Sequence, residues 1–322
     1  MSFLYNQLFV HPAYPSKLFT GQTIIVTGSN VGLGKEAARH FTRLGAEKVV
    51  LAVRNLTSGN EAKEDIEKST GRHGVCEVWY LDLASFTSVK AFAARVSTDL
   101  KRVDAVVENA GISSYSFQLA EGYERTITVN VISTFLLALL LLPKLKEVSA
   151  SSSKDTEKPR LSIVTSEVHS WTDLPERKEK NTFHALSQPP PVSNMGLRYQ
   201  TSKLLEVLAV RELAPRFAEA GVILNMVNPS FCHSELLREV DKWYVALFKW
   251  FLARSTEEGG RTLVAAAATG TESHGAYMNN GVTDNGSLSE FVRSEEGKKA
   301  EKKVWGELAE ILEGIQPGIT RA

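Results

Sequence analysis

The sequence is poor in cysteine and carries no excess of either charge. Its 322 residues include two cysteines, Cys76 and Cys232, which are too few for a disulfide framework and fit a reducing compartment. Lysine plus arginine and aspartate plus glutamate each number 37, so the net charge is +0. A protein that follows a phosphate backbone normally has a basic excess. We therefore expect no nucleic-acid partner and a cytoplasmic location.

Long hydrophobic runs and metal-binding spacings are also missing. The longest purely apolar run, 135–142, stops at Pro143, whereas a membrane-spanning helix needs about 20 such residues. Residues 1–20 lack the pattern of a signal peptide and are expected to form an arm on the body of the protein. No His-x3-His or Cys-x2-Cys pair occurs, so no metal site is expected.

What the chain does have is a regular alternation of short β-branched runs and longer helical patterns. Strands are expected at 22–27, 47–53, 75–81, 103–107, 160–165, 222–227 and 275–280. Helices are expected at 34–44, 58–69, 85–100, 128–146, 199–220, 234–253, 256–268 and 290–314. This alternation predicts an α/β single-domain Rossmann fold over residues 21–322, a doubly wound parallel sheet of about seven strands with helices on both faces. The polar stretch 171–195 is expected to be a substrate-loop insertion.

A glycine-rich turn joins the first strand to the first helix. Residues 27–34 read TGSNVGLG, with Gly28, Gly32 and Gly34 in a Gly-x3-Gly-x-Gly spacing. Glycines at such a turn let a pyrophosphate approach the backbone, and the free N–H groups at the start of the helix face the anion. A tight structural turn is the alternative, but the place between a strand and a helix favours dinucleotide binding.

The residue expected near the adenosine ribose is basic. An acidic side chain about 20 positions after the glycines would bond the ribose 2′-hydroxyl of NAD. That place is taken by Arg54, whose planar guanidinium pairs well with a phosphate. NADP(H) is therefore expected in preference to NAD(H), and a solvated surface charge is the alternative interpretation of Arg54.

Tyr199 and Lys203 lie on one face of the helix predicted at 199–220. A neighbouring ammonium favours the phenolate form of a tyrosine, whose ordinary pKa is about 10. Tyr199 could then exchange a proton with a carbonyl or alcohol oxygen. Ser166 follows the strand 160–165, at the sheet edge where ligands bind, and could hold the substrate oxygen. A turn or helix-cap serine is the alternative for Ser166.

In this order the motifs resemble those of the short-chain dehydrogenase/reductase family. The landmarks, over residues 20–280, are TGSNVGLG, Asp82-Leu83, Asn109-Ala110-Gly111, Asn130, Ser166, Tyr199-x3-Lys203 and Asn228-Pro229. The segment RYQTSKLLEVLAVREL is similar to the retinol-dehydrogenase-like branch. The catalytic residues that the resemblance implies are Tyr199, Lys203, Ser166 and Asn130, with Asn130 fixing a relay water. The cofactor-binding residues that it implies are Gly28, Ser29, Asn30, Gly32, Leu33, Gly34, Arg54, Asp82, Leu83, Asn109, Ala110, Gly111, Tyr199, Lys203, Pro229 and Ser234.

The sequence departs from the family pattern at a few positions. Glu108 stands where the first asparagine of Asn-Asn-Ala-Gly is usual, and its carboxyl is expected to alter packing at that strand end. Ser230 replaces the glycine that usually follows Asn-Pro, and Ser234 a threonine. His169 is expected to be a hydrogen-bonded structural histidine.

The resemblance implies an NADP(H)-dependent oxidoreductase (EC 1.1.1.-), a ketoreductase or alcohol dehydrogenase that moves a hydride between nicotinamide and a carbonyl or alcohol carbon. The aromatic stretch 243–251, in a substrate lid expected over about 231–255, favours a bulky apolar substrate such as a secondary metabolite or a retinoid- or steroid-like compound. Burial of these aromatics in the core is the alternative. The resemblance also allows a homodimer. Two other functions stay open: a redox-neutral isomerase, epimerase or cyclase, and a catalytically idle nucleotide-sensing interaction protein.

Overall fold

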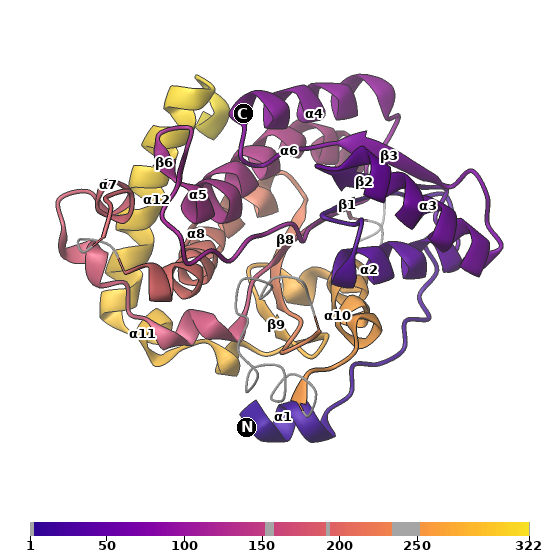
Figure 1. Ribbon diagram of the computed structural model, residues 1–322. Coiled ribbons are helices and arrows are strands. Elements are labelled where there is room, and N and C mark those ends of the chain that lie inside the picture. Colours follow the sequence, from indigo (N-terminus) through magenta and orange to yellow (C-terminus); the bar gives the residue numbers. More distant parts are fainter. Residues whose placement is uncertain (1–2, 152–157, 191–193, 234–251, 322) are drawn as a thin grey trace.

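A computed structural model describes residues 3–151, 158–190, 194–233 and 252–321. Its main sheet has eight strands in the order β10-β9-β8-β7-β4-β1-β2-β3 (Figure 1). Their bounds are β1 (Thr23–Thr27), β2 (Lys48–Val53), β3 (Cys76–Tyr80), β4 (Ala105–Glu108), β7 (Arg160–Val164), β8 (Ile223–Asn228), β9 (Tyr277–Asn279) and β10 (Val282–Thr283). The predicted parallel sheet of seven strands is confirmed, and the edge strand β10, which pairs antiparallel with β9, is an addition.

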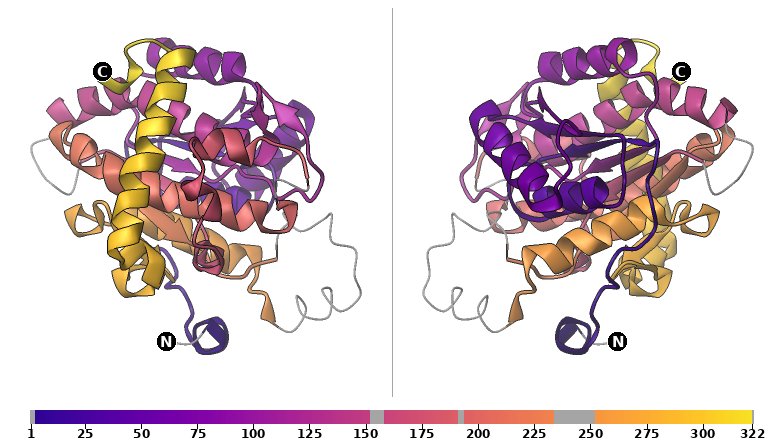
Figure 2. Two further views of the ribbon diagram at one scale, coloured as in Figure 1. Left: turned by 90° about the vertical axis from the view of Figure 1, so that its left-hand side faces the viewer. Right: turned by 90° about the vertical axis from the view of Figure 1, so that its right-hand side faces the viewer.

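Helices cover both faces of this sheet (Figure 2). One face carries α2 (Gly32–Arg43), α3 (Leu56–Thr70) and α10 (Thr256–Ala268). The other face carries α4 (Phe86–Asp99), α6 (Ser133–Ser151) and α8 (Arg198–Glu219). Shorter or peripheral elements are α1 (Phe3–Phe9), β5 (Leu119–Ala120), β6 (Tyr123–Glu124), α5 (Arg125–Ile127), η1 (Thr128–Ile132), η3 (Glu167–Trp171), η4 (Pro175–Lys178), α7 (Thr182–Leu186), η5 (Met195–Leu197), η7 (Thr271–Ser273), η8 (Asn285–Ser287), α11 (Glu290–Arg293), α12 (Glu295–Ile315) and η9 (Ile319–Arg321).

The alternation of side chains in β1 explains the two helical layers. All five residues of β1 are buried, because successive side chains of a strand point to opposite faces and each face is covered. Ile24 and Val26 pack in the apolar cluster that α2 and α10 form on one side. Ile25, between them, belongs to the cluster of α4, α6 and α8 on the other side. An uninterrupted apolar strand is what a doubly wound sheet requires.

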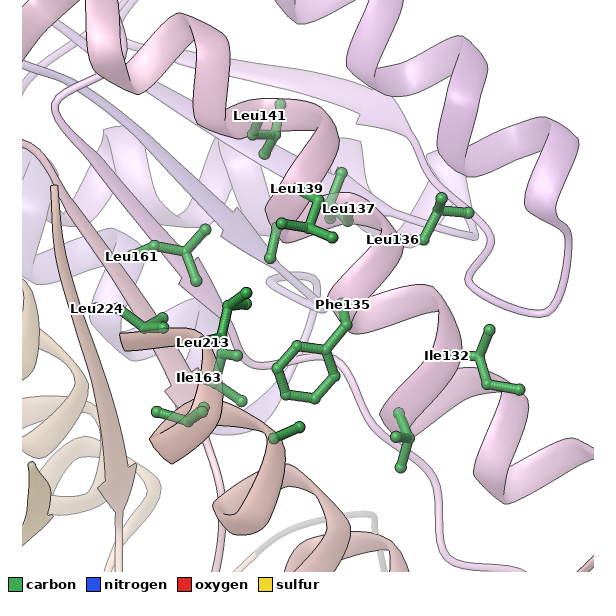
Figure 3. Packing of buried hydrophobic residues seen from close by; sticks show 14 of the residues in the cluster. Ile132, Phe135, Leu136, Leu137, Leu139, Leu141, Leu161, Ile163, Leu213 and Leu224 are labelled. Carbon is green, nitrogen blue, oxygen red and sulfur yellow. The ribbon is translucent and has the colours of Figure 1, made fainter. Parts of the chain in front are cut away.

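The helix predicted at 128–146 is interrupted by a π-helical turn. α5, η1 and α6 follow one another directly, and η1 holds the residues Thr128–Ile132 in the wider π form. The unit Arg125–Ser151 is long and apolar enough to cross a membrane, but 89% of its most apolar window is buried inside the protein. Phe135 packs in the same cluster as Ile163 of β7 and Leu213 of α8 (Figure 3). The apolar side chains of this helix therefore pack in the hydrophobic core of the protein.

The C-terminal helix and the insertion 171–195 differ from the sequence prediction. The helix predicted at 290–314 is broken at Ser294, whose hydroxyl accepts a hydrogen bond from the Gly297 N–H and starts α12. The insertion 171–195 contains the short helices η4 and α7 within its described residues. The Glu307 carboxylate of α12 accepts the N–H of Thr182 at 2.8 Å and so caps α7. The insertion is therefore fastened to the C-terminal helix.

The N-terminal arm packs against the segments on either side of residues 234–251. The side-chain amide of Gln7 donates to the carbonyls of Phe231 at 2.7 Å and Leu252 at 2.5 Å. The Arg254 guanidinium donates to the carbonyls of Asn6 and Val10. The arm thus joins the residues before and after that segment. Most of the substrate lid expected over 231–255 lies outside the described residues.

Candidate active site

The predicted site residues gather at the carboxyl edge of the parallel strands. The glycine turn follows β1, Asn109 follows β4, Ser166 follows β7, and Pro229 follows β8. These four strands are neighbours in the order β8-β7-β4-β1. Because they all run the same way, the four loops lie side by side along one edge, which is where open α/β sheets bind ligands.

The glycine turn is held closely against the loop after β4. Gly28 has a φ of +64°, in the left-handed region, and its N–H donates to the Ala52 carbonyl at 2.8 Å. A Cβ on Gly34 would lie 2.5 Å from Asn109 Nδ2 and 2.6 Å from the Gly28 oxygen. The Asn109 side chain donates to the Thr27 and Gly28 carbonyls at 3.0 and 3.2 Å. Only glycine at position 34 leaves room for this contact.

The outer side of the turn is open and offers unpartnered backbone donors. Gly32 has a φ of +60°, and a Cβ built there would meet nothing within 4 Å. The residue before α2, Val31, supplies no side-chain acceptor to the first N–H groups of the helix. A left-handed glycine next to uncapped N–H groups leaves a cradle that fits a pyrophosphate. The chain therefore has the shape and the donors that a dinucleotide needs here.

Other predicted turn residues support the backbone. The buried Ser29 hydroxyl donates to the Val26 carbonyl at 2.8 Å, and Asn30 Nδ2 donates to Ser58 Oγ at 3.1 Å. Leu33 lies beside Gly259 of α10, where a Cβ would come within 2.8 Å of its side chain. These side chains act on the turn itself, so they hold the shape of the cradle.

Arg54 and Asp82 lie at the ends of the next two strands. Arg54 directly follows β2 and is exposed. Asp82 follows β3, where its carboxylate accepts the Ala84 N–H at 2.9 Å, and Leu83 beside it is buried. β2 pairs with both β1 and β3, so Arg54 lies between the glycine turn and Asp82 along the sheet edge. An exposed guanidinium beside the cradle is placed to meet a phosphate.

Tyr199, Ser166 and Lys203 come together as the sequence predicts. The Tyr199 and Ser166 hydroxyls are hydrogen-bonded to each other. The Lys203 ammonium lies 5.6 Å from the centre of the Tyr199 ring. Burial and the Glu206 carboxylate raise the pKa of Tyr199 above its usual value, while the bond to Ser166 opposes that rise. In this state the phenol is protonated.

Sequence reasoning missed the partner of Lys203, which is Glu206. Lys203 Nζ donates to the two Glu206 carboxylate oxygens at 2.8 and 3.1 Å and to the Val164 carbonyl at 2.8 Å. Both side chains are almost fully buried. The spacing of three on a helix is visible in the sequence, but such a pair usually lies on a solvated face. Whether the Lys203–Glu206 pair is buried depends on how the helix packs in the folded chain.

Asn130 lies in η1 and bridges two parts of the site. Its Oδ1 accepts the Ile112 N–H at 2.9 Å, and its Nδ2 donates to the Ile112 carbonyl and to Ser202 Oγ, both at 2.9 Å. The Ser202 hydroxyl donates to the Tyr199 carbonyl at 2.7 Å. The fully buried side chain of Asn130 thus ties the loop after Gly111 to α8, the helix that carries Tyr199.

The loop after β8 explains one of the departures. Ser230 has a φ of +65°, the conformation that a glycine would take most easily, and its hydroxyl donates to Asn280 Oδ1 at 3.1 Å. Its N–H donates to Asn228 Oδ1 at 3.0 Å. These bonds hold Pro229 at the sheet edge without a glycine. Ser234 lies outside the described residues.

The histidine and cysteine near the site are structural where the chain is described. His169 is fully buried, with Nδ1 bonded to the Ser166 carbonyl at 2.8 Å and Nε2 accepting the Ser289 N–H at 3.2 Å. Cys232 is buried against Gly259, and burial raises the pKa of its thiol to about 12. Among the described residues no group of three histidine, cysteine or acidic side chains is placed to hold a metal ion.

Comparisons with known proteins show the family of the chain. A family model described as short chain dehydrogenase matches residues 22–153. The short chain dehydrogenase/reductase dmxR8 of Cryptosporiopsis sp. (strain 8999) is 47% identical over 326 residues, covering 99% of each chain. The short-chain dehydrogenase anuD of Penicillium roqueforti (strain FM164) is 46% identical over 329 residues, covering 99% of this chain and 84% of that one.

A solved structure supports the fold independently. The NADPH-bound carbonyl reductase from chicken fatty liver superposes with a TM-score of 0.62 at 20% identity, over 83% of this chain and 99% of that chain. This similarity concerns the architecture, whereas the near full-length relatives concern the sequence. From the motifs, the sheet edge that assembles them and these relatives, we conclude that the chain belongs to the short-chain dehydrogenase/reductase family.

Proposed function

We propose that the protein is an NADP(H)-dependent carbonyl reductase or alcohol dehydrogenase. The observation that carries this proposal is the hydrogen-bonded pair of Tyr199 and Ser166 hydroxyls at the sheet edge that also holds the glycine cradle. A nicotinamide held at this edge would supply or accept the hydride at the substrate carbon. The chain supplies the proton and the groups that hold the substrate oxygen.

Each catalytic side chain has a separate task in this proposal. Tyr199, protonated in the described state, gives its proton to the substrate oxygen in reduction and takes it back in oxidation. The Ser166 hydroxyl holds that oxygen beside the phenol. The Lys203 ammonium favours the phenolate that remains after proton transfer. Asn130 keeps the loop after Gly111 and the helix α8 in register.

The preference for NADP(H) rests on Arg54. Its exposed guanidinium lies next to the glycine turn, and no described residue forms an ion pair with it. An acidic side chain at this place would repel a 2′-phosphate, whereas a guanidinium attracts it. A carbonyl reductase bound to NADPH is also among the proteins of similar fold.

A bulky apolar carbonyl compound or alcohol is the proposed substrate class. Trp171, which ends η3 five positions after Ser166, is 63% exposed. An exposed tryptophan near the catalytic serine suits an apolar ligand better than a small polar one. The aromatic residues 243–251 of the sequence favour the same class but lie outside the described residues.

Replacement of Tyr199 tests the catalytic assignment. Tyr199→Phe removes the proton donor and keeps the ring, so we expect turnover of a carbonyl panel to fall at least 100-fold, as for loss of a general acid. NADPH binding, followed by its fluorescence, should change little. Tyr14→Phe, on an exposed ring that packs against His40 of α2, is the matched control and should keep full turnover. Turnover that survives in Tyr199→Phe would remove the phenol from the mechanism, and product formation without NADPH loss would favour a redox-neutral reaction.

A further inference from the structure

Two buried carboxyl groups lie behind the catalytic lysine. Glu206 accepts two hydrogen bonds from Lys203 Nζ, at 2.8 and 3.1 Å, and is 2% exposed. Glu108, at the end of β4, is also buried, and neither of its carboxyl oxygens has a hydrogen-bond partner in the described part of the chain. The negative charge of Glu206 raises the pKa of Glu108 further than burial alone.

The charges of this cluster can be assigned from its surroundings. The groups that act on the Glu206 carboxyl are the Lys203 ammonium on its own helix and the Thr165 hydroxyl after β7. Glu206 in turn raises the pKa values of the Glu108 carboxyl from β4 and of the Tyr199 phenol. Glu108 has no donor to stabilise an ionised form, so it is neutral. Burial raises the pKa of Glu206 to about 7, although Lys203 opposes this rise. Near neutral pH, Glu206 is therefore the group whose charge can change.

The hydrogen bonds of Lys203 leave it no free donor. An ammonium has three N–H groups, and here two point to Glu206 and one to the Val164 carbonyl. The family resemblance, which places Lys203 among the cofactor-binding residues, implies that the same ammonium also holds the nicotinamide ribose. To do so it has to give up at least one of these bonds. The bonds to Glu206 are the ones that a proton can replace, because a protonated carboxyl no longer attracts the ammonium.

We propose that Glu206 is a positioning residue that neutralises Lys203 in the free protein and takes up one proton from solvent when the dinucleotide binds. The carboxylate becomes a carboxylic acid, and the ammonium is released toward the ribose with its full positive charge. That charge then favours the phenolate of Tyr199, so cofactor binding prepares the acid/base group. The inference rests on the proposed function, because it needs a dinucleotide in the cradle.

Calorimetry of NADPH binding measures this proton directly. Titrations at pH 7 in buffers of different ionisation enthalpy give the number of protons taken up per NADPH bound. With a pKa of about 7, Glu206 is half ionised, so we expect wild-type protein to take up about half a proton more than Glu206→Gln. The comparison cancels protons that belong to the NADPH phosphate. Glu212→Gln, the same change further along α8, should behave as wild type.

The pH dependence of NADPH affinity is a second test of the inference, and it can be measured on the wild-type protein alone. Since proton uptake is linked to binding, wild-type affinity for NADPH should be roughly tenfold weaker at pH 8 than at pH 6. Glu206→Gln should flatten that dependence, and Glu206→Asp should restore it. A merely structural glutamate would weaken binding equally at both pH values.

Three results would overturn the inference. Equal proton numbers in wild type and Glu206→Gln would show that Glu206 does not titrate on binding. If the variant fails to fold, the wild-type protein still decides: an NADPH affinity that does not change between pH 6 and 8 would show that Glu206 does not titrate on binding. Absence of any NADPH binding by wild-type protein would reject the proposed function and this inference together, whereas normal binding without proton uptake rejects the inference alone.

Discussion

The proposed preference for NADP(H) depends on one side chain at the sheet edge, Arg54. It stands directly after β2, exposed and beside the glycine turn. A charge-assisted bond from a guanidinium to phosphate contributes about 1.5–3 kcal/mol. A ribose 2′-hydroxyl cannot form that bond. The difference between the two dinucleotides should therefore reside largely in this residue.

Replacement of Arg54 should reduce that selectivity. We expect Arg54→Leu to weaken NADPH binding about 10–100-fold and to leave NADH binding nearly unchanged. Fluorescence titration with each dinucleotide measures both affinities. Lys68→Leu removes an exposed positive charge from the far end of α3 and is the control. If both variants lost the same small factor, the effect would be general electrostatics and Arg54 would not read the phosphate.

Residues whose role depends on long-range packing are those that sequence reasoning missed. Tyr199, Lys203, Ser166 and Asn130 are predicted from motifs, and the fold brings them together at one edge. Glu206 is absent from that prediction, because a helical Lys–Glu spacing does not tell whether the pair faces solvent. Only the packing of α8 against the sheet decides this, and it leaves both side chains almost fully buried.

At the scale of elements, periodic segments are predicted well and locally irregular ones are not. The strands 22–27 and 222–227 match β1 and β8 within a residue at either end. β10 is missed because two residues carry no period. η1 is missed because the one extra residue of a π-helical turn leaves the apolar pattern of the following helix undisturbed. The helix α7 has a local N-cap, because the Asn181 side chain accepts the His184 N–H at 2.7 Å, but five residues are too few for a helical period. Its second acceptor, Glu307, is distant in sequence and leaves no local signal.

The glycine turn is an element whose tolerance can be measured. A Cβ on Gly34 would meet Asn109 and the Gly28 oxygen at 2.5 and 2.6 Å, and neither neighbour can withdraw without breaking the turn. We expect Gly34→Ala to lower the free energy of unfolding by about 1–3 kcal/mol, as overpacking does, and to abolish NADPH binding. Chemical denaturation and fluorescence titration test the two effects.

A second glycine provides the matched control. Gly306 lies exposed in α12, and a Cβ there would meet nothing within 4 Å. Because alanine favours a helix by about 1 kcal/mol over glycine, Gly306→Ala should stabilise the protein slightly and leave binding intact. A Gly34→Ala protein as stable as wild type, with normal affinity, would contradict the close packing described for the turn.

On the scale of the whole molecule, the segments at the two ends of the chain pack against elements that are distant in sequence. α12 packs against α8, and Glu301 of α12 forms an ion pair with Arg211 of α8. The N-terminal arm contacts Phe231 and Leu252, and the insertion is capped by Glu307. The helix that carries Tyr199 is therefore held by α12 from the C-terminal end of the sequence (Figure 2), whereas the N-terminal arm contacts the residues that flank 234–251.

Buried acids should make the stability of the whole protein depend on pH. Burial raises the pKa of Glu108 well above its usual value and the pKa values of Glu167 and Glu206 to about 7. An unfolded glutamate titrates near 4.3, so the folded form binds more protons above that pH. Stability should then be fully present at about pH 4 and be lost as the pH rises through the folded-state values.

Glu108→Gln removes one of these acids while keeping its shape. Each such group contributes a slope of at most about 1.4 kcal/mol per pH unit, so the variant should gain stability over wild type at pH 8 and little at pH 5. Denaturant unfolding at the two pH values measures the difference. Glu61→Gln, on an exposed position of α3, should leave the slope unchanged. Equal slopes for wild type and Glu108→Gln would mean that this carboxyl is not held neutral.

The π-helical turn η1 restricts how this part of the chain can evolve. Each residue of a helix advances it by about 100°, so losing one position among Thr128–Ile132 would rotate all of α6 relative to Asn130. Either the leucines would leave the core or the amide would leave Ile112 and Ser202. A one-residue deletion is harmless in most surface loops, but here it would disrupt the core or the Asn130 contacts. Related sequences should therefore differ in the residue types of this turn but not in its length.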